Sequence, residues 1–121
     1  MSEKYKTHSN GLYFVSFSVV GWLDVFIRRK YQDILTDSIA YCQKNKNLKI
    51  FCYCIMPSHV HFISYSENKE LSNILRDLKS FTAKQVINAI VENPQERDQA
   101  EKLGGMNKNH FFAKNILRAK R

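Results

Sequence analysis

Residues 51–66, FCYCIMPSHVHFISYS, most constrain the fold, because two apolar runs of strand length flank a break at Pro57-Ser58. Runs rich in β-branched and aromatic residues are typical of strands, and a short break with proline is typical of a turn. The segment therefore predicts two paired strands. Because residues i and i+2 of a strand share a face, His59 and His61 are predicted side by side on the second strand, an inner strand of the sheet.

Two neighbouring imidazoles suit a divalent metal ion, provided that further ligands come from elsewhere. The alternative is a chance His-x-His pair in which one ring is packed and the other exposed. The spacing alone leaves both interpretations open, because two ligands do not make a closed site.

The other apolar patterns predict strands over 12–20 and 48–56 and helices over 31–44 and 69–91. The first strand is apolar on both faces, which is typical of a central strand covered on both sides. With the strand that begins at His59, the order is β-α-β-β-α. This order predicts an α+β fold of the ferredoxin-like type, an antiparallel sheet with two helices on one face.

The complete ferredoxin-like unit has a fourth strand, and we find no convincing candidate for it. The last sixteen residues hold one apolar pair, Phe111-Phe112, and no clear period. We expect one C-terminally incomplete domain, 1–121, whose ordered core spans about 11–91. The tail, 92–121, is expected to be mobile or docked on a partner. An unpaired sheet edge seeks partners, so we expect a homodimer formed by edge pairing or tail exchange.

The net charge of +8 favours a polyanionic partner, and nucleic acid is the first candidate. The alternative is a basic protein that binds no polyanion. Two groups of cations are candidate DNA contacts: Arg28, Arg29 and Lys30 in one, and Arg76, Lys79 and Lys84 on the second helix.

No run approaches the roughly eighteen apolar residues of a membrane span, and the N-terminus lacks the apolar core of a signal peptide. The cytoplasm is therefore the expected location, with no membrane partner. The three cysteines, Cys42, Cys52 and Cys54, are expected to be buried reduced thiols.

The string CIMPSHVHFI, residues 54–63, resembles the signature of the HUH single-strand DNA transposases with one catalytic tyrosine. These include the insertion-sequence type and the REP-associated tyrosine transposases. HUH denotes histidine, hydrophobe, histidine, and here it reads His59-Val60-His61. The helix with Lys79-Ser80-Phe81-Thr82 is also similar, and the resemblance covers roughly residues 11–91.

This resemblance implies transesterification of single-stranded DNA, in which a tyrosine hydroxyl attacks a phosphodiester and forms a 5′-phosphotyrosine link. It implies that His59 and His61 hold Mg²⁺ or Mn²⁺, which polarises the phosphate. In the family a late helix carries the nucleophile, and no tyrosine here follows residue 91. The chain thus resembles a member truncated before the tyrosine helix, with impaired activity. Tyr65 shares the predicted face of the two histidines and is the candidate substitute nucleophile.

The expected function is that of a transposase-like protein that binds single-stranded or hairpin DNA. A second interpretation is a non-catalytic nucleic-acid-binding module whose sheet aromatics, Phe14, Phe51, Tyr53 and Phe62, stack on bases. A third is a metal-independent structural protein whose histidines belong to the core.

Overall fold

The computed structural model describes residues 11–66, 71–93 and 111–118. Four strands and two long helices follow one another as β1 (Gly11–Val19), α1 (Arg29–Asn45), β2 (Lys49–Ile55), β3 (His59–Ser66), α2 (Leu71–Glu92) and β4 (Phe112–Arg118). Two short 3₁₀ turns, η2 (Val20–Trp22) and η3 (Val25–Ile27), connect β1 to α1. The predicted strands and helices are confirmed to within a few residues at each end.

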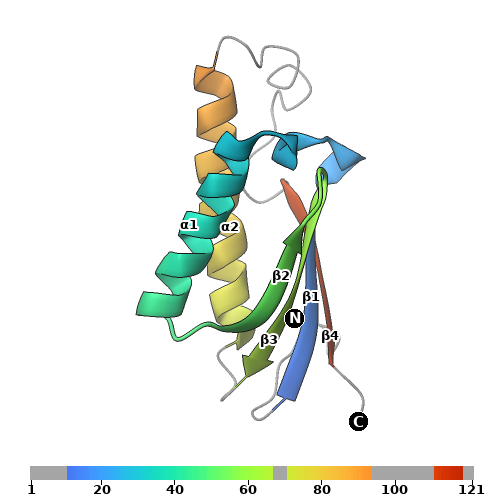
Figure 1. Cartoon of the computed structure of the whole chain (residues 1–121), viewed down its shortest axis with the longest axis vertical. Helices are drawn as coiled ribbons and strands as arrows, with labels where there is room; N and C mark the ends of the chain where they lie inside the picture. The colour runs from blue at the N-terminus through green and yellow to red at the C-terminus, as the bar shows by residue number, and fades with distance from the viewer. Residues whose placement is uncertain (1–10, 67–70, 94–110, 119–121) are drawn as a thin grey trace.

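The four strands form one sheet in the order β2-β3-β1-β4, and each neighbouring pair is antiparallel. Two split β-α-β units interlock in this order: β3 lies between β1 and β2, and β1 lies between β3 and β4. Figure 1 shows both helices on the same side of the sheet. The ferredoxin-like α+β class is therefore confirmed, and the predicted inner position of the histidine strand is confirmed as well.

One face of the sheet is covered by the helices and the other is not. Along β1, Tyr13, Val15 and Phe17 are buried, whereas Leu12 and Phe14 are 41% and 49% exposed. The prediction that both faces of this strand are covered was wrong. Leu12 and Phe14 on the outward face are apolar without being packed, so residue type alone could not separate the two faces at these positions.

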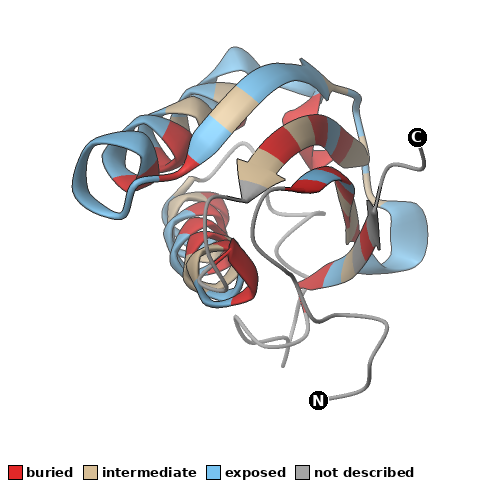
Figure 2. Cartoon of the chain, turned by 90° about the horizontal axis from the view of Figure 1, so that it is seen from below, coloured by how far each residue is buried: buried red, intermediate tan, exposed pale blue. Residues whose placement is uncertain are grey.

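The core lies between the helices and the covered face. Phe17 packs at its centre, with its ring 5.4 Å from that of Phe62 and 5.7 Å from that of Phe112. Each helix turns its buried residues toward the sheet (Figure 2). From α2 these are Leu71, Ser72, Leu75, Leu78, Thr82, Ala83, Val86 and Ile90, at the spacing of one helical face.

The fourth strand exists, and the prediction that it is missing was wrong. Phe112–Arg118 pairs with β1, and Phe112, Lys114 and Ile116 lie opposite Val19, Phe17 and Val15. A lysine between two apolar residues on the covered face breaks the alternation that signals a strand. The predicted tail therefore supplies part of the sheet, and 94–110 and 119–121 lie outside the described residues. Within the described residues, no helix follows β4.

Because β4 covers the edge of β1, the reason given above for a homodimer no longer applies. The outer strands of the described sheet are β2 and β4. β2 carries an irregularity between Ile50 and Cys52, and bulges of this kind disturb the hydrogen-bonding pattern that another strand would use. None of the described helices is long and apolar enough to cross a membrane.

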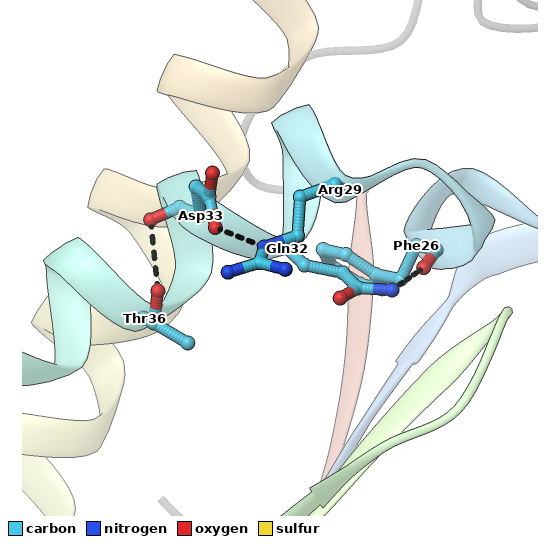
Figure 3. Close-up of polar contacts among 5 residues, drawn as sticks. All are labelled: Phe26, Arg29, Gln32, Asp33 and Thr36. Carbon is cyan, nitrogen blue, oxygen red and sulfur yellow. Dashed lines mark hydrogen bonds and ion pairs between the residues drawn. The ribbon is translucent and has the colours of Figure 1, made fainter.

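Figure 3 shows the polar contacts at the start of α1, one of which reaches the preceding turn. Gln32 Nε2 donates to the carbonyl oxygen of Phe26 at 2.7 Å, which ties α1 to η3. Arg29 Nε donates to Asp33 Oδ1 at 3.1 Å, and Thr36 Oγ1 donates to the carbonyl oxygen of Asp33. The Gln32 contact holds the basic end of α1 against the segment that follows β1, and the other two lie within the first turns of α1 itself.

Candidate functional site

His59 and His61 lie side by side on the face of the sheet that the helices leave open. Their ring centroids are 4.7 Å apart and the rings are nearly perpendicular, at 77°. Between them Val60 points into the core, with none of its surface exposed. The predicted arrangement of the pair is confirmed: neither histidine is a core residue, since His59 is half-buried and His61 is exposed.

The turn that begins β3 is anchored on three sides. Met56 N–H donates to the carbonyl oxygen of His59 at 2.7 Å and closes the turn. The carbonyl oxygens of Pro57 and Ser58 accept 2.8 Å hydrogen bonds from the backbone N–H groups of Phe26 and Val19. The backbone of His59 is therefore fixed by β1 and by η3 as well as by its own hairpin.

Ser58 and Trp22 both contact the His59 ring. Ser58 Oγ lies 3.2 Å from His59 Nδ1. In the tautomer with hydrogen on Nδ1, the ring donates to Ser58 and leaves Nε2 as a ligand atom, which is the usual way in which a second partner orients a metal-binding histidine. The Trp22 ring lies edge-on to His59 at a centroid distance of 5.6 Å.

Two imidazoles fit part of the coordination shell of a divalent ion. Among the residues that the structure describes, no group of three or more His, Cys, Asp or Glu is placed to hold a metal. Mg²⁺ prefers an all-oxygen shell, whereas imidazole nitrogen suits transition metals better. Two imidazole nitrogens alone therefore do not complete a site for Mg²⁺ or Mn²⁺, and either ion would need oxygen ligands in addition.

A groove of about 600 Å³ begins at His61 and extends over β3 between β1 and β2. Its apolar lining includes Phe14, Ile63 and Cys52, and its small side chains include Ser16 and Cys54. The strand register places Ser16 and Cys54 on either side of His61, and Phe14 and Cys52 on either side of Ile63. The groove is therefore continuous with the histidine pair.

The predicted cations at the start of α1 are all exposed. Arg28, Arg29 and Lys30 follow η3, whose first turn is bonded to the hairpin loop beside His59. Arg29 is paired with Asp33 at 3.1 Å, so part of its charge is already neutralised. The structure thus places this cluster on the segment that borders the histidine end of the sheet.

The predicted cations of α2 lie on the helical side of the molecule. Lys114 of β4 lies near two of them, Arg76 and Lys79. Burial of the Lys114 amine, together with the nearby charges of Lys79 and Arg76, lowers its pKa. Arg76 also lies 3.6 Å from Asp77, while Lys84 is exposed farther along α2. Sequence reasoning missed Lys114 because it missed the strand that carries it.

Tyr65 lies on the open face, as its spacing predicted, but it is not beside the histidine pair. It is four residues beyond His61 along β3, which corresponds to about 13 Å. Its ring packs edge-on against Phe51 at 6.5 Å. The position gives Tyr65 no direct contact with the pair, and its role as a nucleophile stays a prediction.

Two of the three cysteines contradict the prediction of buried thiols. Cys42 is buried on α1, and burial is the main cause that raises its pKa, with Lys46 acting against it and Asp77 adding to it. Cys52 and Cys54 are exposed on β2 and line the groove. They share the open face because they belong to an edge strand with no helix above that side.

The model of the IS200-like transposase family matches residues 24–115, which include α1, both strands of the hairpin and α2. The chain belongs to the IS200-like transposase family. The resemblance carried by the hairpin sequence is thereby confirmed. No curated protein matches the chain by sequence.

Two solved structures share the fold of this family member. One is a REP-associated tyrosine transposase bound to a REP hairpin, with 15% identity and a TM-score of 0.61. The match covers all of this chain and 64% of the length of that protein. The other is a proposed transposase from Deinococcus radiodurans R1, with 16% identity and a TM-score of 0.67; it is covered over 88% of its length. At these identities the likeness supports the fold alone.

Proposed function

We propose that this chain binds single-stranded or hairpin DNA and holds a divalent metal ion at His59 and His61 for strand cleavage and transfer through a phosphotyrosine link. The observation that supports the proposal most is the side-by-side pair of imidazoles, 4.7 Å apart, on an open sheet face in a member of this family. The REP-associated relative is bound to a DNA hairpin, and we extend a DNA partner to this chain.

Each residue of the site has a part in this proposal. Nitrogen atoms of His59 and His61 would hold the ion, and Ser58 orients the first ring through Nδ1. When bound, the ion supplies positive charge to the phosphate in the transition state. Arg28 and Lys30 attract the DNA backbone to the histidine end of the sheet, and Arg76, Lys79, Lys84 and Lys114 do the same on the helical side.

The nucleophile is the part of the reaction for which the described residues offer least. Tyr65 shares the face of the pair but lies about 13 Å along the strand, and Tyr5 is outside the described residues. We propose that cleavage by this chain alone is impaired and that a tyrosine from another chain would complete the site. The homodimer remains part of the proposal. The surface proposed to meet the partner is the edge of β4, whose described register has no shift, and not the irregular edge of β2 or the open face.

Metal binding tests the core of the proposal. Mn²⁺ is titrated into the protein and its free fraction is followed by electron paramagnetic resonance. We expect His59→Ala and His61→Ala each to weaken Mn²⁺ binding by at least about tenfold. Tyr65→Phe, on the same face but away from the pair, is the matched control and should bind Mn²⁺ like the wild type. Unchanged binding in both alanine variants would contradict the metal site.

DNA binding tests the rest. Affinity for a DNA hairpin with an unpaired overhang is measured by fluorescence anisotropy at about 50 and 200 mM salt, where several phosphate contacts predict a steep loss of affinity. A phosphotyrosine adduct formed by the chain alone and lost in Tyr65→Phe would contradict the proposed impairment. DNA binding without any metal binding would favour the non-catalytic binding module instead.

A further inference from the structure

We propose that an unpaired DNA strand crosses the open face along β3, with one base in the groove against Phe14 and another against Trp22. A phosphate of the segment between these two bases would then meet His59 and His61. This inference rests on the proposed function and adds to it the residues that select unpaired DNA.

The groove has the size and lining of a site for a flat, largely apolar group. Its volume of about 600 Å³ lies within the usual range for small-ligand pockets. Phe14, 49% exposed, supplies an aromatic face at one side, and Ile63 and Cys52 supply the floor and the other side. Ser16, beside His61, offers a hydroxyl group to the polar edge of a base. A base stacked on Phe14 would thus be next to the metal site.

Trp22 lies on the side of the histidine pair away from the groove. It is 69% exposed, which is unusual for so large an apolar side chain, and it contacts the His59 ring. Its backbone φ is 57°, in the left-handed region that bulky residues rarely adopt, and the preceding Gly21 has φ 80°. The segment is tied down at both ends, by Val20 N–H to Phe111 O and by Phe26 N–H to Pro57 O. A strained backbone that holds an indole in solvent is a feature of ligand-binding sites.

The order of these groups along the sheet matches a strand of nucleotides. Ile63, His61 and His59 follow one another on the open face at every second residue, so the groove and the far histidine are separated by about 13 Å. Trp22 continues the line beyond His59, and the exposed Arg28 and Lys30 follow on the same connection. Aromatic, imidazole and cationic groups therefore alternate in the way that bases and phosphates require.

The positive charge of the chain decides between DNA and other occupants of this apolar face. A second copy of the chain would bring another +8 charge to a face bordered by Arg28 and Lys30, whereas a polyanion relieves that repulsion. A duplex would hide its bases from Phe14 and Trp22, so the aromatic groups favour an unpaired strand over a paired one.

Two direct readouts test the inference on the wild-type chain. Trp22 is the only tryptophan, so its fluorescence reports on this position alone. We expect an unpaired oligonucleotide to quench it and the same sequence in a duplex to leave it nearly unchanged. We also expect the unpaired oligonucleotide to slow iodoacetamide alkylation of Cys52 and Cys54, which line the groove. Quenching and protection that are equal for the two forms of DNA would overturn the proposal.

Substitutions then assign the effect to the two aromatic rings. Phe14→Ala and Trp22→Ala should each weaken binding of the unpaired oligonucleotide by about tenfold or more, while far-UV circular dichroism stays that of the wild type. Phe81→Ala is the matched control, since Phe81 is an aromatic residue of 48% exposure on α2, away from the open face. Equal affinities for Phe14→Ala, Trp22→Ala and Phe81→Ala would overturn the proposed path.

The failure of this inference differs from the failure of the proposed function. If the histidine variants lose Mn²⁺ but the two aromatic variants bind DNA like the wild type, only the path across the open face is wrong. If the histidine variants keep Mn²⁺, the metal site is wrong whatever the aromatic variants do.

Discussion

The two faces of the sheet use similar residues for different purposes. On the covered face, Phe17 and Phe62 are buried and pack edge to face at 5.4 Å. On the open face, Phe14 is 49% exposed and lies beside a groove instead of under a helix. The comparison shows that burial on one face is sufficient to define the fold. The other face is then free to carry aromatic and imidazole groups whose exposure costs stability without loss of the fold.

The largest expected difference between the faces is in stability. Phe17→Ala removes a fully buried ring that contacts both Phe62 and Phe112, so we expect a loss of about 3–5 kcal/mol in the free energy of unfolding. Phe14→Ala, on the same strand but the other face, should cost less than about 1 kcal/mol. Urea denaturation measures both. A Phe14→Ala cost as large as that of Phe17→Ala would mean that the open face is packed.

Thiol reactivity should also separate exposed from buried positions. Cys52 and Cys54 are exposed, whereas Cys42 is buried and its pKa is raised chiefly by that burial, so less thiolate forms at neutral pH. We expect the two exposed thiols to react with a disulfide reagent at least about a hundredfold faster than Cys42, which reacts only when the fold opens. Mass spectrometry of the labelled peptides identifies each site. Early labelling of Cys42 would contradict its burial.

On the helical side, Lys114 should contribute one phosphate contact. We expect Lys114→Gln to reduce the slope of log affinity against log salt by about 1 and to weaken DNA binding severalfold. Anisotropy titrations over a range of salt concentrations measure both quantities. Lys44→Gln, which removes an exposed charge from the last turn of α1, is the control. Equal effects of the two variants would mean that only net charge matters.

The smallest effect expected is on stability, and it has the opposite sign. The folded-state pKa of Lys114 is lowered, first by burial and then by Lys79 and Arg76, from an ordinary value of 10.5. At neutral pH the Lys114 amine is charged in both the folded and the unfolded state. Only in the folded state is the charged amine partly buried near other cations, so its charge lowers the stability of the fold. Lys114→Gln should therefore stabilise the fold, on the order of 0.5 kcal/mol after solvent screening is allowed for. This gain should shrink as the pH rises toward 10.5, because the folded wild type releases its proton first. Denaturant midpoints across this pH range test the sign.

The sequence predicted those elements in which buried residues recur at the spacing of a helix or a strand. It did not predict the elements whose inward positions are only partly buried. The hairpin, α1 and α2 follow from apolar spacing, and the side-by-side histidines follow from the two-residue period of β3. β4 was missed because Lys114 occupies a position on its covered face, and a half-buried lysine cannot be told from an exposed one by residue type. Cys52 and Cys54 were misplaced for the converse reason: apolar residues on an edge strand need not be buried.

The candidate site was predictable only in its local part. His59 and His61 are adjacent in sequence, so strand geometry is enough to bring them together. Trp22 and Ser16 reach the pair through the pairing of β1 with β3 and through the turn after β1, and no local pattern encodes that contact. A stacking role for Phe62 was wrong because its parity places it in the core, whereas Phe14 and Phe51 are exposed.

The pairing of β4 with β1 has a consequence for how the chain folds as it leaves the ribosome. Among the described strands β1 is made first, and it is bonded on one side to β3 and on the other to a strand that is made only after both described helices. Until Phe112–Arg118 appears, the nascent protein displays an unfilled row of amide and carbonyl groups beside its hydrophobic centre. We therefore expect the sheet to be completed only after Phe112–Arg118 has been synthesised. Nascent chains that stall before these residues are expected to depend most on chaperones.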